Sequence, residues 1–129
     1  MKAYKYLYDE GVIHRDMKPD NVLYNLLENG ELEIKICDFG LATNTLATKS
    51  NTIAGTRLYL APEILTRKYD DKVDIYPLGV MMFELLIGDH PIEVECDENQ
   101  FKIDNKAVEK LLEKEKVAPV LIEFIMRCI

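Results

Sequence analysis

The sequence of 129 residues is poor in residue types that mark particular protein classes, with no tryptophan, two histidines and three cysteines. The cysteines, Cys37, Cys96 and Cys128, are odd in number and lack CxxC spacing. They argue against a disulfide framework and indicate a reducing compartment, so we expect an intracellular, cytoplasmic protein. The sequence also lacks a cluster of cysteine and histidine with the spacing of a zinc site.

Basic residues are in the minority, with 16 lysines and arginines against 23 aspartates and glutamates and a net charge of −7. A negative chain is a poor partner for nucleic acid or for an anionic membrane, so neither partner is expected. Two interpretations of the acidic balance stay open. One is a partner that carries basic residues, and the other is an ordinary solvated acidic surface.

A long hydrophobic run is missing. The longest apolar stretch, PLGVMMFELLIG at residues 77–88, contains Glu84 and is shorter than the roughly 20 residues that span a bilayer. The opening residues, MKAYKYLYDE, lack the apolar core of a secretory signal. The length suits one domain at most, and the hydrophobic share of 48% is ordinary for a soluble globular protein.

The apolar residues that are present follow helical spacing in four places. The pattern predicts a helix over residues 3–10, a helix buried on all sides over about 74–88, and amphipathic helices over 106–115 and 120–129. Most of the chain outside its middle is therefore expected to be helical.

A β-hairpin is expected between the first two helices. The segments VLYN and LEIKIC have strand composition, and the turn between them contains Asn29-Gly30, a strong hairpin signal. The polar stretches 43–51 and 90–100 show no period and are predicted to be connections. The predicted fold class is mainly α with a short β-hairpin.

Three short motifs follow one another in the first half of the chain: HRDMKPDN at residues 14–21, CDFG at 37–40 and AGTRLYLAPE at 54–63. They resemble the catalytic loop and the two ends of the activation segment in eukaryotic protein kinases, serine/threonine type. The resemblance implies ATP and Mg²⁺ as cofactors and proteins with serine or threonine as substrates.

The resemblance also implies a role for each residue of the reacting centre. Asp16 would be the catalytic base, and Lys18 would neutralise charge on the transferred phosphoryl group. Asn21 and Asp38 would bind Mg²⁺ beside the nucleotide. Thr56 would tie the activation segment to Asp16 and Lys18.

Further positions carry implied roles in nucleotide binding and regulation. Leu23 falls where family members place an apolar floor under adenine, although an ordinary core position is an equal alternative. Phe39 would set the active or inactive state by its packing. Arg15 would pair with a phosphate on Thr52, and the alternative for Thr52 is a plain loop hydroxyl.

Two acidic residues match substrate-binding positions of relatives that prefer basic substrates. Asp20 and Glu84 would contact an arginine of the substrate, although Glu84 is equally well explained as a satisfied helix residue. Asp74 matches the family aspartate that anchors the backbone of the catalytic loop. Tyr76-Pro77 replaces the usual Trp-Ser of the family, which leaves the start of the helix open.

The resemblance covers the chain as part of a kinase domain, the C-terminal (large) lobe, with the N-terminal lobe absent. The sequence has no Gly-rich phosphate loop and no VAIK-type lysine. The implied parts are the end of helix E, a catalytic loop at 14–21, an activation segment at 38–63, helix F at about 74–88, and helices G and H within 97–129.

Three functions follow from these observations. The first is a fragment of a serine/threonine protein kinase that has little or no activity alone, because nothing closes over the nucleotide. The second is a non-catalytic lobe that acts by binding proteins. The third is a small-molecule kinase, which Thr56 and the APE sequence at 61–63 disfavour.

Overall fold

The computed structural model describes residues 2–44, 53–66, 69–93 and 102–129, and the chain divides after Asp74 into two compact units. Within the described residues there are four α-helices and three small antiparallel two-stranded pairings. The predicted fold class, mainly α with a short β-hairpin, is confirmed. No helix in these ranges is both long enough and apolar enough to cross a membrane.

The first unit begins with helix α1 (Lys2–Asp9), which ends just before Gly11 as predicted. Tyr4 and Leu7 are the buried side chains of this helix, whereas Tyr8 is 56% exposed. The Tyr4 hydroxyl donates a hydrogen bond to the carbonyl of Asp71 at 3.3 Å. This hydrogen bond links α1, at the start of the first unit, to the 3₁₀ turn η5 (Asp71–Asp74), at the end of that unit.

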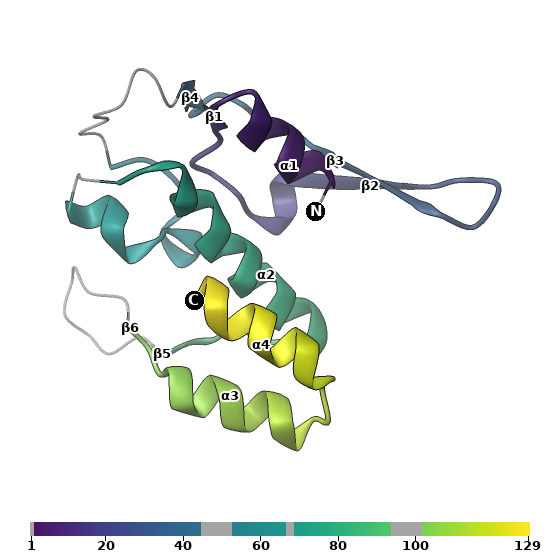
Figure 1. The fold of residues 1–129 in the computed structure, drawn as a ribbon, viewed down its shortest axis with the longest axis vertical. Helices are drawn as coiled ribbons and strands as arrows, with labels where there is room; N and C mark the ends of the chain where they lie inside the picture. The colour runs from purple at the N-terminus through teal and green to yellow at the C-terminus, as the bar shows by residue number, and fades with distance from the viewer. Residues whose placement is uncertain (1, 45–52, 67–68, 94–101) are drawn as a thin grey trace. The chain divides into compact units, whose positions relative to one another are not determined.

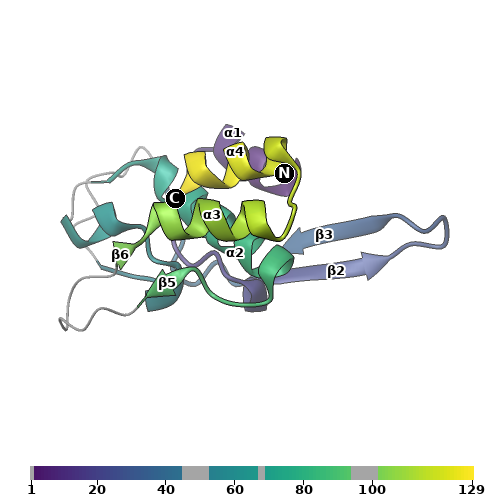
Figure 2. The ribbon, with the colours of Figure 1, turned by 90° about the horizontal axis from the view of Figure 1, so that it is seen from below.

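The predicted hairpin is formed by β2 (Val22–Leu26) and β3 (Leu32–Ile36). The Gly30 amide donates to the carbonyl of Leu27, and Gly30 has φ +81°, a conformation that glycine adopts without steric cost. Figures 1 and 2 both show the hairpin as a long ribbon whose turn projects away from the rest of its unit.

The ribbon has one wholly apolar face. In the observed register Val22 pairs with Ile36, Tyr24 with Ile34, and Leu26 with Leu32. Because side chains alternate along a strand, these six residues share a face. The opposite face carries Leu23, Asn25, Glu33 and Lys35.

Two predicted connections contain short strands. Thr43–Asn44 is β4, which pairs with β1 (Val12–Ile13), so the predicted loop over 43–51 was wrong at its first two residues. Ile92–Glu93 is β5, which pairs with β6 (Lys102–Ile103), so the stretch 90–100 is also more than a connection. Each strand has two residues, which is too short for a periodic signal in the sequence.

The second unit is built from α2 (Ile75–Ile87), α3 (Asn105–Lys114) and α4 (Pro119–Cys128). Figure 1 shows α4 running alongside α2, with α3 on the other side of α4. The core of this unit consists of buried side chains from all three helices: Phe83, Val108, Leu112 and Ile125.

Local chemistry explains where these helices begin. Pro77 is the third residue of α2, in the first turn, where a missing backbone N–H costs little. The Asp104 carboxylate accepts hydrogen bonds from the amides of Lys106 and Ala107 and so caps α3. Gly79 lies where α2 meets α4, and a side chain there would lie 2.5 Å from Cβ of Cys128.

Candidate active site

The centre of the first unit is the carboxylate of Asp16, which four hydrogen-bond donors surround. Its Oδ1 accepts from the backbone amide of Thr56 at 2.8 Å and from the Thr56 hydroxyl at 2.7 Å. Its Oδ2 lies 3.0 Å from the Lys18 ammonium and 3.1 Å from the side-chain nitrogen of Asn21. The structure therefore brings together four residues that the motifs singled out.

These donors set the charge of Asp16. Burial alone would raise the pKa of its carboxyl, but hydrogen bonds from Thr56 and Lys18 outweigh burial and hold the pKa below its usual range. The hydrogen bond that the Lys18 ammonium donates to Asp16 also raises the pKa of Lys18. Near neutral pH the two side chains are therefore a carboxylate and an ammonium, an anion suited to accept a proton beside a fixed cation.

Lys18 also contacts Thr56 directly. Its ammonium donates to the Thr56 hydroxyl at 2.9 Å, and that hydroxyl donates its own hydrogen to Asp16. Each of the three side chains is therefore hydrogen-bonded to the other two, although Asp16 and Thr56 lie 40 residues apart in the sequence. The segment that carries Thr56 is thus fixed to the loop that carries Asp16.

Asn21 is buried at the end of the 3₁₀ turn η1 (Pro19–Asn21). Its side-chain nitrogen donates to the carbonyl oxygen of Asp16 at 2.8 Å and to the Asp16 carboxylate. An amide has two N–H donors and one carbonyl acceptor. Both donors are therefore directed at Asp16, and the side-chain oxygen is the atom left to act as a ligand.

The β-hairpin pairing places Cys37, the residue before Asp38, opposite Asn21. The amide of Cys37 donates to the carbonyl of Asn21 at 2.9 Å, which continues the ladder of β2 and β3 by one pair. Asp38 follows with φ +61°, and its carboxylate is exposed and accepts from the Gly40 amide at 3.2 Å. A carboxylate and an amide oxygen are ligands that Mg²⁺ accepts, usually together with water and phosphate oxygens, so this pair fits the ion.

That donor set is sparse on its own. Within the described ranges no three side chains of histidine, cysteine, aspartate or glutamate gather into a metal site. Mg²⁺ keeps several waters and is commonly held by one or two protein groups plus phosphate. The pair of Asn21 and Asp38 is therefore suited to an ion that arrives with a nucleotide rather than to a permanently bound metal.

Asp74 holds the backbone that leads into this centre. Its two carboxylate oxygens accept from the amides of His14 at 2.6 Å and of Arg15 at 2.8 Å. Arg15 has φ +66°, an uncommon conformation for a residue with a side chain, and the Asp74 bond is one interaction that stabilises it. Burial raises the pKa of Asp74, and the two amide donors oppose that rise.

His14 links the catalytic loop to the residues around Asp38. The Asp16 amide donates to Nδ1 of His14 at 3.3 Å, so Nε2 carries the ring hydrogen and donates to the carbonyl of Cys37 at 3.0 Å. The Phe39 ring packs edge-on against the imidazole with ring centroids 4.9 Å apart. This role of His14 was not predicted from the sequence, although the place of His14 in the motif HRD was a signal for one.

Arg15 contacts the region after Phe39. Its Nε donates to the carbonyl of Leu41 at 2.6 Å, and its Nη1 donates to the Tyr69 hydroxyl at 3.3 Å. Thr52, the predicted phosphate carrier that would pair with Arg15, lies outside the described residues. Tyr69 is a contact that the sequence analysis missed, because nothing in the local pattern connects it to residue 15.

The remaining predicted site residues are Leu23, Asp20 and Glu84. Leu23 is 54% exposed on the polar face of the hairpin, so the alternative of an ordinary core residue does not hold. Asp20 is exposed in η1, within the first unit. Glu84 belongs to α2 of the second unit, where it lies 3.9 Å from the His90 ring.

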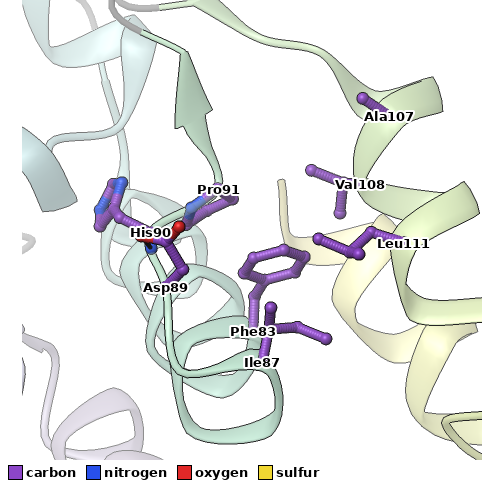
Figure 3. Close-up of a pocket in the computed structure, with 8 residues that line it drawn as sticks. All are labelled: Phe83, Ile87, Asp89, His90, Pro91, Ala107, Val108 and Leu111. Atoms are coloured by element: carbon purple, nitrogen blue, oxygen red, sulfur yellow. Dashed lines mark hydrogen bonds between the residues drawn. The ribbon is translucent and has the colours of Figure 1, made fainter. Parts of the chain in front are cut away.

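The second unit contains a hollow of about 380 Å³ between the end of α2, the residues that follow it and α3 (Figure 3). Phe83 and Ile87 from α2 face Val108 and Leu111 from α3 across this hollow. Six of its eight lining residues are apolar, and Asp89 and His90 are the polar ones. None of the motif residues described above lines it.

Comparison with known proteins agrees with this geometry. Residues 1–129 match the family described as "Protein kinase domain". Serine/threonine-protein kinase pakA of Talaromyces marneffei is 36% identical over 129 residues, which cover 97% of this chain and 20% of the relative. Serine/threonine-protein kinase CST20 of Candida albicans (strain WO-1) is 38% identical over 133 residues, which cover 100% of this chain and 10% of the relative.

A third relative supports the same relationship. An Aurora kinase of Dictyostelium discoideum is 41% identical over 100 residues, which cover 77% of this chain and 25% of the relative. The chain thus spans between 10% and 25% of the length of these three proteins. Since the family match extends over every residue of the sequence, the chain belongs to the protein kinase domain family.

Proposed function

We propose that this chain carries the catalytic loop and activation segment of a serine/threonine protein kinase, within the C-terminal lobe. The whole protein would transfer the γ-phosphoryl group of ATP to serine or threonine hydroxyls of other proteins. One observation carries the proposal: the Asp16 carboxylate is held by Thr56, Lys18 and Asn21 at distances of 2.7 to 3.1 Å.

The residues of this set have complementary roles in the proposed reaction. Asp16 accepts the proton of the attacking hydroxyl or orients that hydroxyl, and its low pKa keeps it anionic. Lys18 places a positive charge beside Asp16, where it stabilises the negative charge of the transferred group. Thr56 keeps both side chains in position, so it is a positioning residue.

Asn21 and Asp38 would hold Mg²⁺ when the nucleotide is bound. The ion supplies positive charge that neutralises the phosphates of ATP. The support from this chain is the free side-chain oxygen of Asn21 and the exposed carboxylate of Asp38 at neighbouring positions of the hairpin base. Leu23, which is exposed one residue into β2, is available to contact the adenine.

The preference for serine and threonine is supported by Lys18 and Thr56 and by the names of the pakA and CST20 relatives, which are serine/threonine-protein kinases. Asp20 and Glu84 are proposed to favour substrates with basic residues near the acceptor. Arg15 and Thr52 are proposed as a regulatory pair, and Phe39 is proposed to set the active or inactive state by its packing. We further propose a cytoplasmic protein without nucleic-acid or membrane partners, in keeping with its net charge of −7.

The 129 residues alone are proposed to have little or no kinase activity. They contain no Gly-rich loop and no VAIK-type lysine to hold the phosphates of ATP. Phosphoryl transfer depends almost entirely on positioning and electrostatic stabilisation. The activity is therefore a property proposed for a longer protein that includes this chain.

The test is transfer of phosphate from γ-labelled ATP to a serine peptide by the whole natural protein, with a tyrosine peptide for comparison. Asp16→Asn is expected to lower the rate at least about a hundredfold, the scale of general-base catalysis. The matched control is Glu28→Gln, an exposed residue of the hairpin turn. A folded whole protein that transfers no phosphate, or an unchanged rate in Asp16→Asn, would favour the non-catalytic binding module.

A further inference from the structure

A second hollow of the second unit differs from the one in Figure 3, because its rim is charged. It lies between α3 and α4 and has a volume of about 480 Å³. Its floor is formed by the apolar side chains of Val117, Ile122 and Met126, with Pro119 at the start of α4. We call this hollow the α3–α4 groove.

Three carboxylates line the α3–α4 groove. Glu109 and Glu113 stand one turn apart on α3, and Glu123 faces them from α4. Arg127 is the one basic residue of the lining, and its guanidinium lies 3.7 Å from Glu123 in an exposed pair. Among the described residues no cation lies within ion-pair distance of Glu109 or Glu113, so the lining has a net negative charge.

Within the described part of the chain, no ion pair joins the lysines of α3 to Glu109 or Glu113. Lys106, Lys110 and Lys114 repeat every fourth residue and form a stripe next to the glutamates, but none of them lines the groove. The helix thus separates its charges, with the acidic stripe toward α4. An apolar floor under an acidic rim is complementary to an apolar surface bordered by positive charge.

The dimensions of the groove suit a helix. Residues 119 to 127 of α4 cover about 12 Å at 1.5 Å per residue, which is roughly two helical turns. A partner helix would present apolar residues at i, i+3, i+4 and i+7 over this length.

We infer that the α3–α4 groove is a docking site for a basic amphipathic helix of a partner protein. Apolar side chains of that helix occupy the floor of Ile122 and Met126, and its lysine or arginine side chains lie beside Glu109 and Glu113. The inference concerns the second unit alone. It uses none of the residues proposed to act in phosphoryl transfer, so it goes beyond the proposed function.

The experiment measures the affinity of the chain for a synthetic peptide by fluorescence anisotropy. The probe is an amphipathic peptide with leucines at i, i+3, i+4 and i+7 and arginines on both flanks of that stripe. Its control has the same leucines with glutamates in place of the arginines. The arginine peptide is expected to bind, more weakly as ionic strength rises, and the glutamate peptide is expected not to bind.

Charge reversal on the groove tests the position of binding. Glu109→Lys/Glu113→Lys is expected to weaken binding of the arginine peptide roughly tenfold, since each exposed pair contributes modestly. The matched control is Glu10→Lys/Glu28→Lys, which changes the net charge equally at two exposed residues that do not line the groove. The control is expected to change the affinity less than about twofold.

A third variant, Met126→Asp, tests the apolar floor and is expected to weaken binding by about the same factor. Far-ultraviolet circular dichroism shows whether that variant is folded, and the exposed glutamate variants decide the question if it is not. The inference is overturned if the arginine peptide does not bind, if the glutamate peptide binds equally, or if both charge-reversal variants weaken binding alike. None of these outcomes bears on phosphoryl transfer.

Discussion

Thr56 donates two hydrogen bonds to the same carboxylate oxygen of Asp16, from its backbone amide at 2.8 Å and from its hydroxyl at 2.7 Å. The second carboxylate oxygen is left to Lys18 and Asn21. One threonine therefore determines which edge of the carboxylate faces the ammonium. This arrangement connects the stability of the loop to the protonation of Asp16.

Replacing Thr56 by valine is expected to lower the free energy of unfolding by about 2 kcal/mol at pH 7, because a bond to a charged group is lost. The pKa of Asp16 is lowered in the folded state, so its contribution is present above the unfolded pKa of about 3.9 and lost as the pH falls through the folded pKa. Urea unfolding of both proteins across pH 3 to 7 measures the difference.

The difference between wild type and Thr56→Val should therefore be largest near neutral pH and shrink below about pH 4. Thr56→Ser retains the hydroxyl and serves as the control, with a loss of less than about 1 kcal/mol expected. A difference that stays constant to the acid end of the range would show that the hydroxyl does not act through the ionised carboxylate.

Asp74→Asn is expected to destabilise the chain by about 2 to 3 kcal/mol, measured by urea unfolding. Asp74 is buried and uses both oxygens to accept backbone amides, whereas an asparagine offers one oxygen and turns an N–H toward the second amide. Asp20→Asn, at an exposed position of the same loop region, is expected to cost less than about 0.5 kcal/mol. Equal losses in the two variants would contradict this role of Asp74.

Gly55→Ala is expected to cost at least about 2 kcal/mol, because glycine is required there for two reasons. Its φ is +120°, and an added Cβ would collide with the carbonyl oxygen of Arg15 and lie 2.9 Å from Leu60 Cδ1. Gly30→Ala has the strain of φ +81° with nothing within 4 Å, so about 1 kcal/mol is expected. Thermal unfolding of both variants separates collision from strain, and a smaller loss at Gly55 would contradict the close approach.

Gly79→Ala is expected to destabilise the second unit by about 1 to 3 kcal/mol, although alanine favours helices more than glycine does. The added Cβ would lie 2.5 Å from Cβ of Cys128 and 2.8 Å from Cγ2 of Ile129, which forces α2 and α4 apart. Leu85→Ala in the same helix, at a side chain 87% exposed, should change the stability by less than about 0.5 kcal/mol. A stabilised Gly79→Ala would show that helix propensity outweighs the contact.

The helices were predictable from their apolar residues: a continuous apolar run around Phe83 predicted α2, and the spacing of Val108 and Leu112 predicted α3. The prediction that α2 is buried on all sides was wrong, because the Leu85 side chain is 87% exposed. The strands β4, β5 and β6 could not be predicted from the sequence, because a two-residue strand depends on a partner distant in sequence rather than on its own residues.

The candidate site divides in the same way. Asp16, Lys18, Asn21 and Thr56 were predictable from their motifs, and the structure brings them into contact. The left-handed backbone conformation of Arg15 and the hydrogen bond that Arg15 donates to Tyr69 could not be predicted from the sequence. Both depend on residues that lie more than 50 positions away, Asp74 and Tyr69 respectively, and local patterns carry no signal of such bonds.

The pairing of β2 with β3 determines how the candidate site tolerates insertions in the hairpin. Asn21 and Cys37, the residue before Asp38, are opposite each other because the ladder of β2 and β3 is paired from its base, whatever the number of residues between them. Adding one residue to each strand near Gly30 lengthens the hairpin and leaves the pairing at the Val22 and Ile36 end unchanged. Adding a single residue to one strand would move the residues on the far side of the insertion to the other face, and such a slip is opposed by the pairing itself. Hairpin length and ligand spacing can therefore vary independently, as long as insertions are shared equally by the two strands.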